Sequence, residues 1–215
     1  MSAPHPRSSG AFGHLVASEE ELARLYGVPG APSVVKEVAY LTPSYRAVVA
    51  ASPFCVLATV GPEGLDCSPR GDAPGFVHVE DERTLLLPDR RGNQRIDSLR
   101  NVVRDPRVAL LFFVPGVPET LRVNGTAAIS ADAALRERFA VDGAVPRTVL
   151  VVSVERAYFQ CARALLRSGL WDPARHVPRD HLPSAGTMLA EASGGAEGGA
   201  AYDRDLPARQ RSTLY

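Results

Sequence analysis

The chain has 215 residues, of which 45% are hydrophobic, and this length is sufficient to bury the core of one compact domain. Lysine plus arginine number 24, as do aspartate plus glutamate, so no overall charge indicates a nucleic-acid partner or an anionic membrane surface. Any anion site is therefore expected to be local.

The first segment, residues 1–17, lacks the apolar core of a signal peptide, and we expect it to form a flexible arm. No stretch is apolar for long enough to cross a membrane, which predicts a cytoplasmic protein. Cys55, Cys67 and Cys161 are widely spaced and form no CxxC motif. We therefore expect free, reduced cysteines, with neither a disulfide framework nor a metal site.

Two helices are predicted before the first strand of the main domain. Ser18 is a good N-cap, Glu21 follows three residues later, and Gly27 is suited to the residue after the helix. Thr42 and Pro43 start a second helix in "TPSYRAVVAAS".

From Phe54 onward, short runs rich in β-branched residues alternate with turn-forming residues. This pattern predicts an antiparallel sheet or barrel. The predicted strands are residues 54–60, 75–79, 84–87, 107–114, 121–130 and 148–154.

One helix is predicted between the strands, in "GNQRIDSLRNVVRDP" (92–106). Ile96, Leu99, Val102 and Val103 fall at helical spacing on one face, and Pro106 ends the pattern. We place the main domain at residues 18–183. Residues 184–201 are rich in Gly, Ala and Ser, so 184–215 is predicted to be a flexible linker and a charged tail.

The stretch "CSPRGDAPGF" (67–76) is interpreted as a constrained turn that carries Arg70. Glycine allows close approach to a ligand and proline stiffens the loop, while arginine can bind a phosphate or carboxylate with two hydrogen bonds. The alternative is a surface turn with an Arg–Asp ion pair.

A second candidate anion site lies in "LLLPDRRGNQR" (85–95). Arg90 and Arg91 precede Gly92 and Asn93, which are predicted to open the helix, with Arg95 in its first turn. A helix N-terminus with free N–H groups binds anions, and phosphate is the natural ligand. The alternative is a solvated basic helix start. Neither GxxxxGK[ST] nor GxGxxG is present.

In "TLRVNG" (120–125), alternation places Leu121 and Val123 on one face and Arg122 and Asn124 on the other. Arg122 could reach a ligand or simply face solvent.

The segment 159–173 presents Gln160, Arg163, Arg167 and Trp171 on a short helix and loop. Packing of its leucines and of the tryptophan in the core is an equal alternative.

No GxSxG or HExxH motif is present, and the five histidines are scattered. A phosphate site without acid–base or metal machinery suggests a bound cofactor that carries the reaction itself.

Five segments in order resemble the pyridoxamine 5'-phosphate oxidase-like FMN-binding split-barrel family, within it a bacterial subgroup described as FMN-dependent enzymes. They are "SPRGDAPGFV", "LLLPDRRGNQRIDSLRN", "PRVALLFFVPG", "ETLRVNGTA" and "QCARALLRSGLW", and the resemblance covers about residues 18–175. It implies a mainly β (α+β) fold, a six-stranded antiparallel split β-barrel with flanking helices. It also implies a homodimer with FMN at the subunit interface.

The resemblance also implies a set of cofactor-binding residues. Arg70 would lie near the FMN phosphate and ribityl chain, Pro88 and Asp89 near the flavin ring, and Asn93 and Arg95 at the phosphate. The block that ends at Trp171 would reach the site from the other subunit. The full set is Arg70, Gly71, Asp72, Pro88, Asp89, Arg90, Asn93, Arg95, Thr120, Arg122, Gln160, Arg167 and Trp171.

The chain departs from the oxidases themselves, because their RxVLLK strand and SRK loop are replaced by "PRGDAPGFV" and "GNQR". Recognition of pyridoxamine phosphate is therefore not implied. The resulting hypothesis is an FMN-dependent oxidoreductase acting on a small molecule, with catalytic residues not identified. The alternative is a non-catalytic flavin, haem or deazaflavin carrier on the same barrel.

Overall fold

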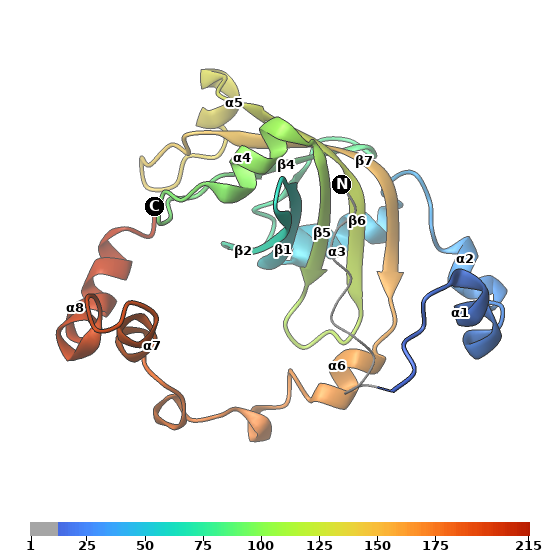
Figure 1. Cartoon of the computed structure of the whole chain (residues 1–215). Helices are drawn as coiled ribbons and strands as arrows, with labels where there is room; N and C mark the ends of the chain where they lie inside the picture. Colours follow the sequence, from blue (N-terminus) through green and yellow to red (C-terminus); the bar gives the residue numbers. More distant parts are fainter. Residues whose placement is uncertain (1–12) are drawn as a thin grey trace. The chain divides into compact units, whose positions relative to one another are not determined.

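The computed structural model describes residues 13–215 (Figure 1), so most of the predicted N-terminal arm lies outside the described residues. The chain divides into two units, of which the first ends at Lys36 and the second comprises Glu37–Tyr215. The first unit contains helices α1 (Glu19–Tyr26) and α2 (Ala31–Val35). The backbone N–H of Glu21 donates to Ser18 Oγ at 3.2 Å, and Gly27 ends α1 with φ 70°, which confirms the predicted caps.

The second unit is built on one antiparallel sheet of seven strands in the order β2-β1-β5-β6-β7-β4-β3. The strands are β1 (Phe54–Gly61), β2 (Gly64–Gly71), β3 (His78–Val79), β4 (Thr84–Pro88), β5 (Arg107–Phe113), β6 (Thr120–Ser130) and β7 (Val149–Gln160). The end strands β2 and β3 do not pair with each other, so the barrel stays open. The predicted split-barrel class is confirmed, with one strand more than the six expected.

The additional strand is β2, and the interpretation of residues 67–71 as a turn was wrong. These residues pair antiparallel with β1, with Cys55 opposite Arg70 and Val56 opposite Pro69. Pro69 lacks an N–H, but β2 lies at the edge of the sheet, where a strand tolerates proline. The turn comes later, at residues 72–75, where Phe76 N–H donates to Ala73 O and Gly75 takes a φ of +83°.

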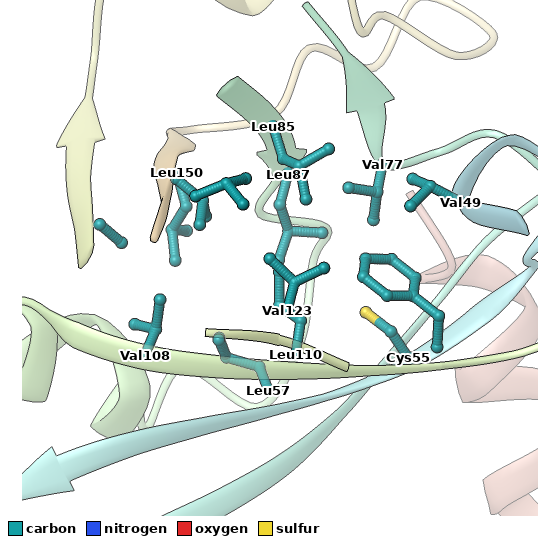
Figure 2. Packing of buried hydrophobic residues seen from close by; sticks show 14 of the residues in the cluster. Val49, Cys55, Leu57, Val77, Leu85, Leu87, Val108, Leu110, Val123 and Leu150 are labelled. Atoms are coloured by element: carbon teal, nitrogen blue, oxygen red, sulfur yellow. The ribbon is translucent and has the colours of Figure 1, made fainter. Parts of the chain in front are cut away.

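The core forms because alternate side chains of the strands face inward. Figure 2 shows Leu57 and Leu110, from β1 and β5, pointing toward Leu87 and Leu150, from β4 and β7. β4 and β1 are separated by β5, β6 and β7 in the sheet, yet their side chains share one cluster. The sheet therefore curls around its own apolar face.

Helix α3 (Pro43–Ala51) contributes to this core through the fully buried Val49. Thr42 Oγ1 accepts from Tyr45 N–H at 3.2 Å, which confirms the predicted cap.

Helix α4 (Asp97–Arg104) starts five residues after the predicted opening at Gly92, and its buried face differs from the prediction. Val102 is buried, but Ile96 and Val103 are 46% and 78% exposed. The buried positions include Ser98 and Asn101, because α4 packs on β1 and β2 partly through hydrogen bonds. Leu99 packs against the core as well, so apolar spacing predicted Leu99 and Val102 correctly but Ile96 and Val103 wrongly, and it did not reveal the buried polar positions.

The rest of the unit is helical: α5 (Ala133–Glu137), α6 (Arg163–Ser168), α7 (Ala185–Ala192) and α8 (Gly199–Ser212), with 3₁₀ turns at Pro173–Arg175 and Arg179–His181. The prediction of a flexible linker at 184–201 was wrong, since α7 and the start of α8 occupy most of it. Ser184 caps α7, and Asp203 of α8 accepts from Gly186 N–H at 2.7 Å. These contacts join α7 to α8. They could not be predicted from the composition of residues 184–201, which shows only that the segment is rich in small residues. The domain boundaries at 18–183 and 184–215 stay predictions.

Candidate cofactor site

A cavity of about 1170 Å³ lies where β2, the segment 88–99 and the segment 144–148 meet, and Tyr215 completes its wall. Strand pairing explains the meeting point. Pro88, the last residue of β4, pairs with Val149, the first residue of β7, so the segment leaving β4 lies beside the segment entering β7. Ser98 Oγ donates to Asp66 Oδ2 at 3.0 Å, which joins the start of α4 to β2.

Three arginines from three separate segments line this cavity: Arg70 on β2, Arg91 after β4 and Arg147 before β7. Among residues 13–215, none of the three forms an ion pair with a carboxylate, and Arg70 Nη1 donates only to Pro69 O, at 2.9 Å. None of the three is therefore in direct contact with an acid, although Arg70 and Arg147 lie close enough to Asp89 to act on its carboxyl electrostatically. Such a group of guanidinium ions favours a phosphate or carboxylate ligand.

Two other predicted arginines have acidic partners. Arg90 Nε donates to Asp72 Oδ2 at 2.6 Å, and the side chains are only 18% and 5% exposed. Arg95 Nε donates to Asp97 Oδ2 at 2.8 Å at the surface. Both arginines line the cavity, but their charges are largely compensated, so they are weaker candidates for binding an anion than Arg70.

The turn before α4 is strained at two residues that line the cavity. Gln94 and Ile96 adopt left-handed backbone angles, with φ of 62° and 52°, which is unusual for a β-branched residue such as Ile96. Asn93 Oδ1 accepts from Arg95 N–H at 3.1 Å, which makes a local turn instead of the predicted helix start. Strain of this kind concentrates at functional sites.

The N-terminus of α4 has no side-chain cap, because its N-cap residue is Ile96. Asp97, Ser98 and Leu99, which form the first turn, line the cavity. N–H groups at an uncapped helix start need an acceptor, and a bound anion supplies one. The helix start at which the sequence predicts an anion site therefore lies at Asp97 and not at Gly92.

The cavity wall includes two polar groups that are at least partly buried. Asp89 is half-buried, and burial raises the pKa of its carboxyl, although Arg70 and Arg147 oppose the rise. Thr148 Oγ1 is buried and has no hydrogen-bond partner among the described residues. A buried hydroxyl without a partner is costly unless a ligand or water satisfies it.

The sequence analysis missed Arg147, Thr148 and Tyr215. Arg147 and Thr148 precede a strand and carry no motif of their own. Only the pairing of β4 with β7 brings them beside Asp89. Tyr215 lay in a segment interpreted as a tail.

Of the predicted residues, Arg70, Gly71, Pro88, Asp89, Arg90, Asn93 and Arg95 line the cavity. Asp72 contacts it indirectly, through Arg90 and Tyr215. The others do not line it. They are Thr120, Arg122, Gln160, Arg167 and Trp171.

These five residues have other surroundings within the chain. Thr120 pairs with Gln160 across β6 and β7, and Arg122 Nη1 lies 3.1 Å from the Tyr158 hydroxyl. Trp171 Nε1 donates to Val117 O at 2.9 Å. Arg167 is exposed on α6.

Core packing, the alternative considered for segment 159–173, is wrong for Leu166 and Leu170, whereas Leu165 is half-buried. Leu166 and Leu170 are 66% and 48% exposed. The contribution of this segment to the site of a second subunit stays a prediction.

The described residues contain no cluster of three or more His, Cys, Asp or Glu side chains able to hold a metal ion. Cys55, Cys67 and Cys161 form no disulfide among the described residues, and burial raises the pKa of the Cys55 thiol to about 12. Over residues 13–215, none of the helices combines the length and apolarity needed to cross a bilayer.

A comparison with solved structures returns proteins that match about half of this chain. HupZ of Group A Streptococcus is 19% identical with a TM-score of 0.45, and the match covers 54% of this chain and 90% of HupZ. A Lactobacillus delbrueckii protein assigned to pyridoxamine 5'-phosphate oxidase is 22% identical with a TM-score of 0.45, covering 56% and 95%. An F420 reductase is 20% identical with a TM-score of 0.40, covering 55% and 98%.

A comparison with curated proteins finds no match. The family model described as pyridoxamine 5'-phosphate oxidase matches residues 41–161, which is more than half of the chain and includes all seven strands. The chain therefore belongs to the pyridoxamine 5'-phosphate oxidase-like family.

Proposed function

We propose that the chain is an FMN-dependent oxidoreductase of this family, acting on a small molecule. The observation that carries the proposal is the group of Arg70, Arg91 and Arg147, three cations that line one cavity and form no direct ion pair with an acid among the described residues. A flavin phosphate would neutralise them, and it would also accept hydrogen bonds from the uncapped first turn of α4.

The residues present fit this cofactor. The Thr148 hydroxyl, buried without a partner, would donate to a ligand oxygen. Pro88 and Asp89 supply backbone next to the cavity, and the raised pKa of the Asp89 carboxyl reflects a partly dehydrated wall. FMN itself would supply the redox chemistry, taking electrons from a reduced donor and passing them to an acceptor. The protein would bind the phosphate, orient the ring and exclude water.

A homodimer is part of this proposal. Gln160, Arg167 and Trp171 do not line the cavity of their own chain, and Leu166 and Leu170 are exposed on the surface of the same segment. A second copy that covered this surface would bring the three residues to its partner's cofactor. Light scattering at micromolar concentration tests the dimer. Trp171 fluorescence, since Trp171 is the single tryptophan, tests its proximity to FMN.

The decisive experiment is a visible absorption spectrum of the purified protein with and without added FMN, followed by anaerobic addition of NADH and then NADPH. Flavin bands that bleach with a donor and return with air support the oxidoreductase. Flavin bands that do not bleach with either donor favour a flavin carrier or an enzyme that uses another reductant. An absence of bound flavin after titration with FMN refutes the proposal, and a haem or a deazaflavin would then be titrated in its place.

A further inference from the structure

We propose that Tyr215 is a ligand-contacting residue of the cofactor cavity, and that Asp72 and Arg90 are the positioning residues that hold it there. The inference rests on the proposed function, because it takes FMN to be the ligand. It assigns a role to a carboxy-terminal segment that the sequence marks only as a charged tail.

Three contacts fix the position of Tyr215. Its hydroxyl donates to Asp72 Oδ1 at 2.7 Å, and its ring lies 5.5 Å from the Arg90 guanidinium carbon. Arg90 Nε in turn donates to the other carboxylate oxygen, Asp72 Oδ2, at 2.6 Å. Tyr215 and Arg90 both line the cavity. One aromatic ring is therefore held by a charge-assisted hydrogen bond and a cation–π contact against the cavity wall.

The supporting pair is itself held firmly. Asp72 Oδ1 also accepts from Ala73 N–H at 2.7 Å, and Arg90 Nη1 donates to Phe139 O at 2.6 Å. With its side chain only 5% exposed, Asp72 is a poor candidate for a ligand-binding carboxylate. Its bonds instead connect the end of β2, the segment after β4 and Tyr215.

This arrangement separates the arginines of the cavity into two roles. Arg90 contacts Asp72 and Tyr215, whereas Arg70, Arg91 and Arg147 form no direct ion pair with an acid among the described residues. Arg90, predicted to bind the cofactor, therefore acts through Tyr215. An aromatic ring on a cavity wall offers a flat surface for a flavin or for a planar substrate.

The experiment measures FMN release from the full chain. Bound FMN is diluted and the recovery of flavin fluorescence is followed for wild type, Tyr215→Phe, Tyr215→Ala and the control Leu214→Ala, whose side chain is 63% exposed. We expect both Tyr215 variants to release FMN about tenfold faster, since each loses a hydrogen bond to a charged group. Leu214→Ala should release at the wild-type rate. The visible spectrum of bound FMN should shift in the Tyr215 variants alone, which a role in folding would not produce.

The inference is overturned if both Tyr215 variants release FMN at the wild-type rate. It is also overturned if Leu214→Ala accelerates FMN release as much as the Tyr215 variants do. If wild type binds no FMN, the proposed function fails first, and the docking of Tyr215 is tested without ligand. Trypsin should then cut after Arg209 and Arg211 faster in Tyr215→Phe than in wild type or Leu214→Ala. Equal cutting rates would show that Tyr215 does not hold the segment in place.

Discussion

Replacing Arg70 by alanine tests the site most directly. Arg70 is half-buried on β2, lines the cavity, and has Pro69 O as its only hydrogen-bond acceptor among the described residues. A hydrogen bond between charged groups contributes about 1.5–3 kcal/mol, so its loss should weaken FMN binding by about 10- to 100-fold. Arg70 also opposes the burial-driven rise in the pKa of Asp89, and that opposition would disappear with it.

The assay is titration of FMN with protein, followed by quenching of flavin fluorescence. Arg107→Ala is the matched control, because Arg107 is exposed, pairs with Asp105 and does not line the cavity. Arg95→Ala should have an intermediate effect, since Asp97 already compensates its charge. FMN affinity within twofold of wild type in Arg70→Ala, with the fold intact by circular dichroism, would refute the assignment of the phosphate to Arg70.

Three further predictions concern stability. Asn101→Ala removes the 3.0 Å hydrogen bond from Asn101 Nδ2 to the buried Thr59 hydroxyl. Urea unfolding should show that the free energy of unfolding falls by about 1–3 kcal/mol. The control Arg104→Ala, at an exposed position of the same helix, should lower it by less than about 0.5 kcal/mol. Gln94 has a left-handed backbone conformation that glycine adopts without strain. Gln94→Gly should therefore raise the unfolding free energy of the FMN-free protein by about 1 kcal/mol. An unchanged melting curve would show that the backbone at Gln94 is not strained. Burial holds the pKa of Asp89 in the folded state above the ordinary 3.8. The ionised carboxylate therefore destabilises the fold at neutral pH. This destabilisation is lost as the pH falls through the folded-state pKa, because the carboxyl is then protonated. Asp89→Asn should therefore stabilise the protein at neutral pH but not below pH 3.8, and an equal gain at both would exclude the carboxyl charge as the cause.

Features that depend on neighbouring residues were predictable from the sequence. Ser18 and Thr42 cap their helices as expected, because a cap needs only a side chain that reaches an N–H two or three residues ahead. The inward-facing strand residues, such as Leu121 and Val123, also follow from simple alternation. The family could also be predicted, because five segments resemble it in the order in which they occur along the chain.

Features that depend on distant residues were not predictable. β2 contains Asp, Ser, Pro and Gly, and it is a strand because β1 pairs with it. Helix α4 buries Ser98 and Asn101 because Asp66 and Thr59 accept their hydrogen bonds, which helical spacing does not reveal.

The residues of the candidate cofactor site divide in the same way. Its arginines and the loop after β4 stand out in the sequence, but Arg147, Thr148 and Tyr215 do not. The first two reach the cavity because β4 pairs with β7, and Tyr215 reaches it through a hydrogen bond to a residue 143 positions away. Local composition determined which side chains could bind an anion. Strand pairing and long-range hydrogen bonds, which form only when the chain folds, decided which of them line one cavity.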